Sequence, residues 1–250
     1  MALLQSLLDL VFSPICLGCD SPISPGDPAR LVCRRCRARL PLPPAPLCRR
    51  CGAPRLRTGR QDSGLSCREC EHWPPALRSA RSACLLLPPA DRLVHQLKYR
   101  GWRSLASPMA ERMAAVALPP DVLEEARFVV PVPTTPARRR TRGYNQAELL
   151  AGAYAARTGR QMFSALLRST ASSSQIALQP AERGANVISA FRVAAGTERG
   201  LQQAHILLVD DVLTTGATAG ECARVLVSAG ARTVSILTFA RAPTVRELPT

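Results

Sequence analysis

The stretch "HILLVDDVLTTGATAG" (residues 205–220) joins a short apolar run, two adjacent aspartates and a turn rich in threonine and glycine. The apolar run predicts a buried strand, and the small residues after the turn predict the start of a helix. In open parallel sheets, ligands bind at the carboxyl ends of the strands. Two carboxylates placed there repel one another, so we expect Asp210 and Asp211 to serve a ligand.

The turn from Thr214 to Thr218 indicates which chemical groups this ligand carries. Backbone N–H groups at a helix N-terminus, beside threonine hydroxyls, form a cradle for an anion. Gly216 permits close backbone approach and an unusual turn. The chain has neither a Gly-x-Gly-x-x-Gly nor a P-loop Gly-Lys-Thr motif, so neither of those nucleotide sites applies. Carboxylates for hydroxyls and N–H groups for a phosphate together fit a sugar phosphate.

Around this stretch, strand and helix patterns alternate. Apolar runs predict strands at residues 127–133, 205–211 and 233–240, and helical patterns occupy residues 145–158 and 216–231. This alternation predicts an α/β fold, a parallel sheet covered by helices on both faces. A helical region before the first of these strands is expected to form a cap over the sheet.

The first part of the chain is rich in proline, arginine and cysteine. Two Cys-x-x-Cys pairs let four thiolates reach one tetrahedral zinc ion, and such closed sites supply folding energy to a segment with little core. The simplest assignment joins the first two pairs into one site and the last two into another; a crossed arrangement stays open. The eight cysteines are Cys16, Cys19, Cys33, Cys36, Cys48, Cys51, Cys67 and Cys70.

Export and membrane insertion are not expected. The apolar N-terminal stretch has no basic n-region, contains Asp9, lacks a small-residue cleavage site and is too short to span a bilayer. We therefore expect a cytoplasmic protein without a transmembrane segment, in which a disulfide framework is disfavoured. His72 is an alternative zinc ligand or a surface residue. The leucines and valine of the stretch recur at helical spacing and predict a short amphipathic helix: Leu3, Leu4, Leu7, Leu8 and Val11.

The net charge of the chain indicates which kinds of partner it attracts. The 250-residue chain has 33 basic and 18 acidic residues, a formal net charge of +15, and Lys98 is its only lysine. Arginine favours planar, bidentate contacts with phosphate or carboxylate. A chain this basic attracts polyanions, either nucleic acid or phosphorylated ligands.

The stretch "ILLVDDVLTTGAT" (residues 206–218) resembles the phosphoribosyl pyrophosphate (PRPP) motif of type I phosphoribosyltransferases. The resemblance implies that Asp210 and Asp211 hold the ribose 2′- and 3′-hydroxyls and that Mg²⁺ accompanies the pyrophosphate. It also implies that the 5′-phosphate is wrapped by Thr214, Thr215, Gly216, Ala217 and Thr218.

Three further stretches, "LVHQLKYRG", "VPVPTTPARRRTRGYNQAELLA" and "SSSQIALQPAERGANVISAFRV", together with the cysteine pairs, resemble the ComF family of ComFC/GntX-like proteins. The resemblance covers nearly the whole chain. It implies a double zinc ribbon in residues 1–75 and a phosphoribosyltransferase-like domain in residues 76–250, with residues 76–126 as its cap or hood. It also implies a link to DNA uptake and natural transformation.

Type I enzymes bind pyrophosphate with the loop after the first strand of the sheet. In this chain the loop carries Arg138, Arg139, Arg140 and Arg142, whose guanidinium groups suit phosphate; a solvated basic loop is the alternative. The polar segment 170–187 is expected to be a lid. Its Arg183 is a candidate to reach over the pyrophosphate, and Lys98 is a candidate ligand contact, although both equally fit ordinary solvated positions. Asn145 is expected to cap the helix that follows.

Nothing in the sequence reads a nucleobase, and aromatic residues make up only 4% of the chain. The acceptor of any phosphoribosyl transfer is therefore not identified, and enzyme activity is left undecided. Three hypotheses stand: a Mg²⁺-dependent PRPP-binding protein or phosphoribosyltransferase, a protein that handles single-stranded DNA through its zinc ribbons and basic surface, and a scaffold that keeps the fold without a ligand.

Overall fold

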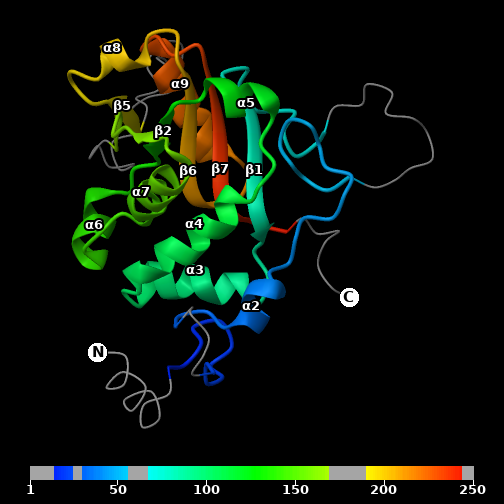
Figure 1. Cartoon of the computed structure of the whole chain (residues 1–250). Coiled ribbons are helices and arrows are strands. Elements are labelled where there is room, and N and C mark those ends of the chain that lie inside the picture. The colour runs from blue at the N-terminus through cyan, green and yellow to red at the C-terminus, as the bar shows by residue number, and fades with distance from the viewer. Residues whose placement is uncertain (1–13, 25–29, 56–66, 169–189, 244–250) are drawn as a thin grey trace, which may run out of the picture.

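A parallel sheet forms the centre of the molecule (Figure 1). The computed structural model describes residues 14–24, 30–55, 67–168 and 190–243. Within these residues, five strands pair in parallel in the order β1-β7-β6-β2-β3. Their bounds are β1 Leu77–Leu85, β2 Phe128–Pro131, β3 Gln161–Met162, β6 His205–Leu213 and β7 Thr233–Arg241. A separate antiparallel pair joins β4 (Leu166–Arg168) to β5 (Phe191–Val193).

Helices cover both faces of this sheet, so the predicted fold class is confirmed. The helices are α2 Arg34–Ala38, α3 Ala90–Tyr99, η1 Arg103–Leu105, α4 Ala106–Ala114, α5 Pro120–Glu125, α6 Pro136–Arg142, α7 Gln146–Thr158, α8 Glu198–Leu201 and α9 Ala217–Ser228. Strand β6 is apolar on both faces: Leu207 and Val209 share a core with α3, α4 and α7, whereas Ile206 and Leu208 share a core with α9.

Among the strands of the sheet that are longer than two residues, the edge strand β1 is the only one that no apolar run in the sequence predicts. Its sequence, "LRSARSACL", alternates arginine and serine with small residues. The serines are accommodated by hydroxyl pairs with β7: Ser79 Oγ lies 2.9 Å from Ser235 Oγ, and Ser82 Oγ lies 2.7 Å from Thr238 Oγ1. A strand stabilised by such pairs carries no continuous apolar run for sequence analysis to detect.

Two predicted segments lie outside the described residues: the N-terminal amphipathic helix and the lid at residues 170–187. The division of the chain near residue 75 stays a prediction. No helix within the described ranges has the length and apolar character needed to cross a membrane.

Candidate functional site

The two aspartates lie near the carboxyl end of β6. Asp211 is buried and Asp210 is half-buried. The Asp211 N–H donates a hydrogen bond of 2.8 Å to Asp210 Oδ1. Burial and the neighbouring Asp211 carboxylate raise the pKa of Asp210 well above its ordinary value. The two carboxylates therefore lie side by side near the carboxyl end of the strand, where the sequence predicts them.

Lys98, on α3, lies beside this pair. Its Nζ is 3.1 Å from Asp211 Oδ2, and the two side chains are only 22% and 4% exposed. The two opposite charges form an ion pair, which offsets the cost of burying the Asp211 carboxylate. Lys98 is therefore held beside the aspartates.

These groups open into a cleft of about 500 Å³. Lys98, both aspartates, Thr214 and Thr218 line it together. Six further polar residues line the cleft that the sequence did not mark as site residues: Asp91, His95, Tyr99, Thr134, Gln146 and Arg168. The position of Thr134 just beyond the carboxyl end of β2 was a usable signal, whereas nothing in the local sequence marks Asp91 or Arg168.

The predicted pyrophosphate loop folds as α6, a short helix capped by the Thr135 hydroxyl. It carries all four predicted arginines, Arg138, Arg139, Arg140 and Arg142. Arg138 lines the cleft. Arg139 pairs with Glu148 at 3.0 Å, and Arg142 donates to the Gln146 side chain. Arg140 is exposed and is not among the lining residues. One of the four arginines, Arg138, therefore lines the same cleft as the aspartates.

The Thr214–Thr218 loop presents two faces. Thr214 and Thr218 line the main cleft, while Thr215, Gly216 and Ala217 line a second groove on the other side, next to Trp73. Gly216 caps α9 with φ +82°, a left-handed conformation that favours glycine. Two of the five loop residues therefore line the cleft of the aspartates, and the anion cradle stays a prediction.

Asn145 and its neighbour Tyr144 together join three elements around the cleft. Its Oδ1 accepts the Ala147 N–H at 3.2 Å, which confirms it as the cap of α7. Its Nδ2 donates to the Val132 carbonyl at 3.0 Å, just after β2. The adjacent Tyr144 hydroxyl donates to the carbonyl of Leu97 on α3. The wall that carries Lys98 is thereby tied to the sheet.

The eight paired cysteines form two clusters, and in each the four Sγ atoms lie within 4.8 Å of one another. The first cluster is Cys16, Cys19, Cys33 and Cys36, and the second cluster is Cys48, Cys51, Cys67 and Cys70. The tandem assignment is confirmed and the crossed one is wrong. All ten cysteines are free of disulfides. His72 belongs to neither cluster; its largely exposed ring lies 3.3 Å from Glu71.

Both clusters fit a zinc ion. Sulfur atoms at the corners of a tetrahedron with zinc–sulfur bonds of about 2.3 Å are about 3.8 Å apart. The Sγ–Sγ distances are 3.9 Å for Cys19–Cys33, 3.7 Å for Cys51–Cys67 and 4.0 Å for Cys48–Cys70. Both clusters therefore have the donors and the spacing of a closed structural zinc site.

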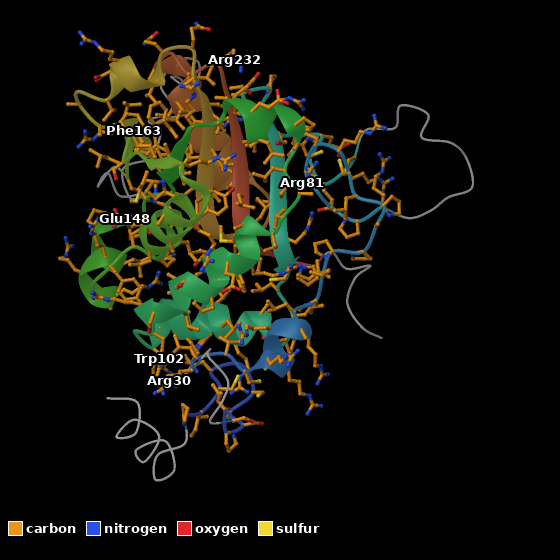
Figure 2. The ribbon with its side chains drawn as sticks, in the orientation of Figure 1. Arg30, Arg81, Trp102, Glu148, Phe163 and Arg232 are labelled. Carbon is orange, nitrogen blue, oxygen red and sulfur yellow. The ribbon has the colours of Figure 1, made fainter. Side chains whose placement is uncertain are left out.

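Arginines fasten the second cluster to the sheet. The Arg50 carbonyl accepts the Ala80 N–H of β1 at 2.8 Å, and Arg81 donates to the Arg49 carbonyl at 3.0 Å. Figure 2 shows Arg81 on the side of β1 next to the cysteine-rich segment. Arg183, the predicted pyrophosphate contact of the lid, lies outside the described residues.

A protein family described as "Double zinc ribbon domain" matches residues 7–71. The chain is 30% identical over 238 residues to "DNA utilization protein YhgH" of Escherichia coli O157:H7, covering 91% of this chain and 96% of the relative. It is 29% identical over 244 residues to "Competence protein ComFC" of Bacillus subtilis strain 168, covering 91% of this chain and 95% of the relative.

Among solved structures, the chain is similar to an allosteric regulatory enzyme of purine biosynthesis, with 20% identity, and to glutamine PRPP amidotransferase from B. subtilis, with 19% identity. Each likeness has a TM-score of 0.36 and covers 58% of this chain and 26% of the solved one, so the chain spans about a quarter of those proteins. The match to YhgH and ComFC along nearly the whole chain, with the double zinc ribbon at its start, shows that the chain belongs to the ComF family.

Proposed function

We propose that the cleft binds PRPP or a related ribose 5-phosphate ligand. Asp210 and Asp211 accept hydrogen bonds from the ribose hydroxyls, and the loop from Thr214 to Thr218 holds the 5′-phosphate. One observation carries this proposal: both aspartates line one cleft together with Thr214 and Thr218 of the loop. Carboxylates accept hydrogen bonds from ribose hydroxyls, and threonine hydroxyls at a helix start suit a phosphate.

The charges around the cleft suit a diphosphate. Lys98, Arg138 and Arg168 line it, and we assign them, with Arg183 of the predicted lid, to the pyrophosphate. Phosphoribosyl transfer expels pyrophosphate while positive charge develops on the sugar ring. Cations on the leaving group and carboxylates near the ribose both lower that barrier.

Mg²⁺ fits this arrangement as a companion of the ligand. Carboxylate oxygens suit Mg²⁺, which is typically bound by one or two carboxylates together with substrate phosphates. Lys98 already neutralises part of the charge on Asp211, so the pyrophosphate oxygens would supply most of the coordination. When bound, Mg²⁺ would offset the negative charge of the leaving pyrophosphate.

Calorimetry of the zinc-loaded protein with PRPP and MgCl₂ tests the proposal. We expect the wild type to bind and the double variant Asp210→Asn/Asp211→Asn to bind at least a hundredfold more weakly, because the ribose acceptors are lost. Asp121→Asn is the matched control, since Asp121 forms an ion pair with Arg78 away from the cleft. Absence of binding by the wild type, or equal binding by the double variant, would contradict the proposal.

A second function, handling of single-stranded DNA during uptake, is favoured by a separate surface. A groove of about 530 Å³ beside the first cluster is lined by three exposed arginines, Arg34, Arg35 and Arg39. Relatives bear the names DNA utilization protein and competence protein. Guanidinium groups along a groove suit the phosphates of a strand.

The salt dependence of binding to a fluorescent oligonucleotide tests this second function. Arg35→Gln/Arg39→Gln should weaken binding and reduce the slope of log affinity against log salt by about 2, one unit per lost phosphate contact. Arg199→Gln on α8 controls for the loss of positive charge from an exposed helix. An unchanged slope in the double variant would exclude this groove.

A further inference from the structure

Trp73 joins the second cluster to the phosphate loop. It follows Cys70 by three residues and is 9% exposed. Its indole Nε1–H donates a hydrogen bond of 2.8 Å to the carbonyl of Thr215, 142 residues further along the chain. Because the peptide group is planar and trans, this bond turns the Thr215 carbonyl toward Trp73 and the Gly216 N–H away from it. The tryptophan thus sets the orientation of a peptide group in the loop.

The loop also fits closely against the indole ring. A Cβ atom added to Gly216 would lie 2.5 Å from Trp73 Nε1 and Cε2, and one added to Gly220 would lie 3.0 Å from Pro74 Cδ. A residue with a side chain therefore fits at position 216 only if the Trp73 ring moves. The backbone at the start of α9 therefore packs directly on the Trp73–Pro74 segment.

Arg50 links this segment to the cysteines. It lies between Cys48 and Cys51, and its guanidinium donates to the carbonyls of Cys70 at 3.1 Å, Trp73 at 3.2 Å and Pro74 at 2.8 Å. The guanidinium carbon also lies 5.9 Å from the centroid of the Trp73 ring. One side chain thus holds both Cys-x-x-Cys turns and the tryptophan in a single arrangement.

We propose that Trp73 is a positioning residue through which the second cluster holds the phosphate loop in its binding conformation. This inference rests on the proposed ribose 5-phosphate site and adds a dependence of that site on the zinc ribbon. A phosphate cradle made of backbone N–H groups binds well only when the loop is held in advance. Arg50 and Trp73 supply that constraint from outside the cleft.

Calorimetry with ribose 5-phosphate on zinc-loaded protein tests the first part. Trp73→Phe keeps an aromatic ring and removes the N–H donor, so we expect roughly fivefold weaker binding with unchanged zinc content, which corresponds to one hydrogen bond. Trp102→Phe is the matched control, because Trp102 is 42% exposed and lies beside α3 (Figure 2). Equal affinity of Trp73→Phe and wild type would overturn the inference.

Fluorescence supplies a second readout. The chain has two tryptophans, so Trp73 is the single tryptophan in the Trp102→Phe protein. Its emission should keep its position when ribose 5-phosphate binds to the zinc-loaded protein, because the loop already has its binding conformation. A shift of the Trp73 emission on binding would show that the loop rearranges around the ring and would contradict the inference alone. A wild type that binds neither ribose 5-phosphate nor PRPP would instead overturn the proposed function, and this inference with it.

Discussion

The two cysteine clusters have the same ligands but support different parts of the molecule (Figure 1). The first cluster packs against α3: Cys16 and Cys36 share an apolar core with Leu97, and Asp20 pairs with Arg92. The second cluster packs on the other face of the sheet, in one core with Ala219 of α9. Because α3 carries Lys98 and the loop from Thr214 to Thr218 leads into α9, the two clusters support different parts of the lining of one cleft.

The kind of contact also differs. The first cluster reaches α3 through apolar packing and an exposed ion pair, neither of which fixes the direction of a peptide group. The second cluster reaches the loop through directional hydrogen bonds from Arg50 and Trp73 to backbone carbonyls. The first cluster thus places a helix, whereas the second cluster orients the backbone that we propose binds phosphate.

Loss of a zinc ligand should give the largest effect. Cys16→Ser and Cys48→Ser should each lose one of two zinc ions, measured by elemental analysis, and several kcal/mol of stability, because the metal supplies the folding energy of each ribbon. Cys48→Ser should also reduce ribose 5-phosphate affinity more than Cys16→Ser does. Cys84→Ala, at a buried cysteine outside both clusters, should retain both ions. Equal affinities of the two serine variants would remove the distinction between the clusters.

A smaller effect is expected at Gly216. Gly216→Ala forces a side chain into a left-handed conformation and against the Trp73 ring, so we expect a loss of about 3 kcal/mol in urea denaturation. Gly159→Ala, also at positive φ but with open space around its Cβ, should lose only about 1 kcal/mol. If the two losses are equal, the contact between the loop and Trp73 contributes nothing.

The smallest effect concerns pH. Burial and Asp211 raise the pKa of Asp210 in the folded protein, so the folded state holds this proton more tightly than the unfolded chain does. Stability from this group is therefore present below the ordinary aspartate pKa and is lost as the pH rises through the raised value. Asp210→Asn should have a higher melting temperature than wild type at neutral pH, and the difference should shrink on acidification. A difference that grows in acid would show that the pKa is lowered instead.

The sequence predicts what depends on local pattern. The apolar run before Asp210, the small-residue turn at Gly216 and the Cys-x-x-Cys spacing each encode their structure within a few residues, and each is found as expected. The bond from Trp73 to Thr215 spans 142 residues, so no local pattern contains it.

The arginines of α6 show a second limit. Their number suggested a four-arginine phosphate site, yet helical geometry spreads neighbouring side chains around the axis. Arg138 consequently lines the cleft while Arg139 turns to Glu148 on α7. The composition of a segment predicts its charge, but the direction of each side chain around the helix determines which arginine can reach a ligand.

The most direct test of the account is a crystal structure of the zinc-loaded protein with PRPP and Mg²⁺. We expect the structure to show the ribose hydroxyls at Asp210 and Asp211 and the 5′-phosphate on the loop from Thr214 to Thr218. We also expect Trp73 to remain bonded to the Thr215 carbonyl. PRPP bound elsewhere, such as in the arginine groove beside the first cluster, with no ligand in the cleft, would contradict the account.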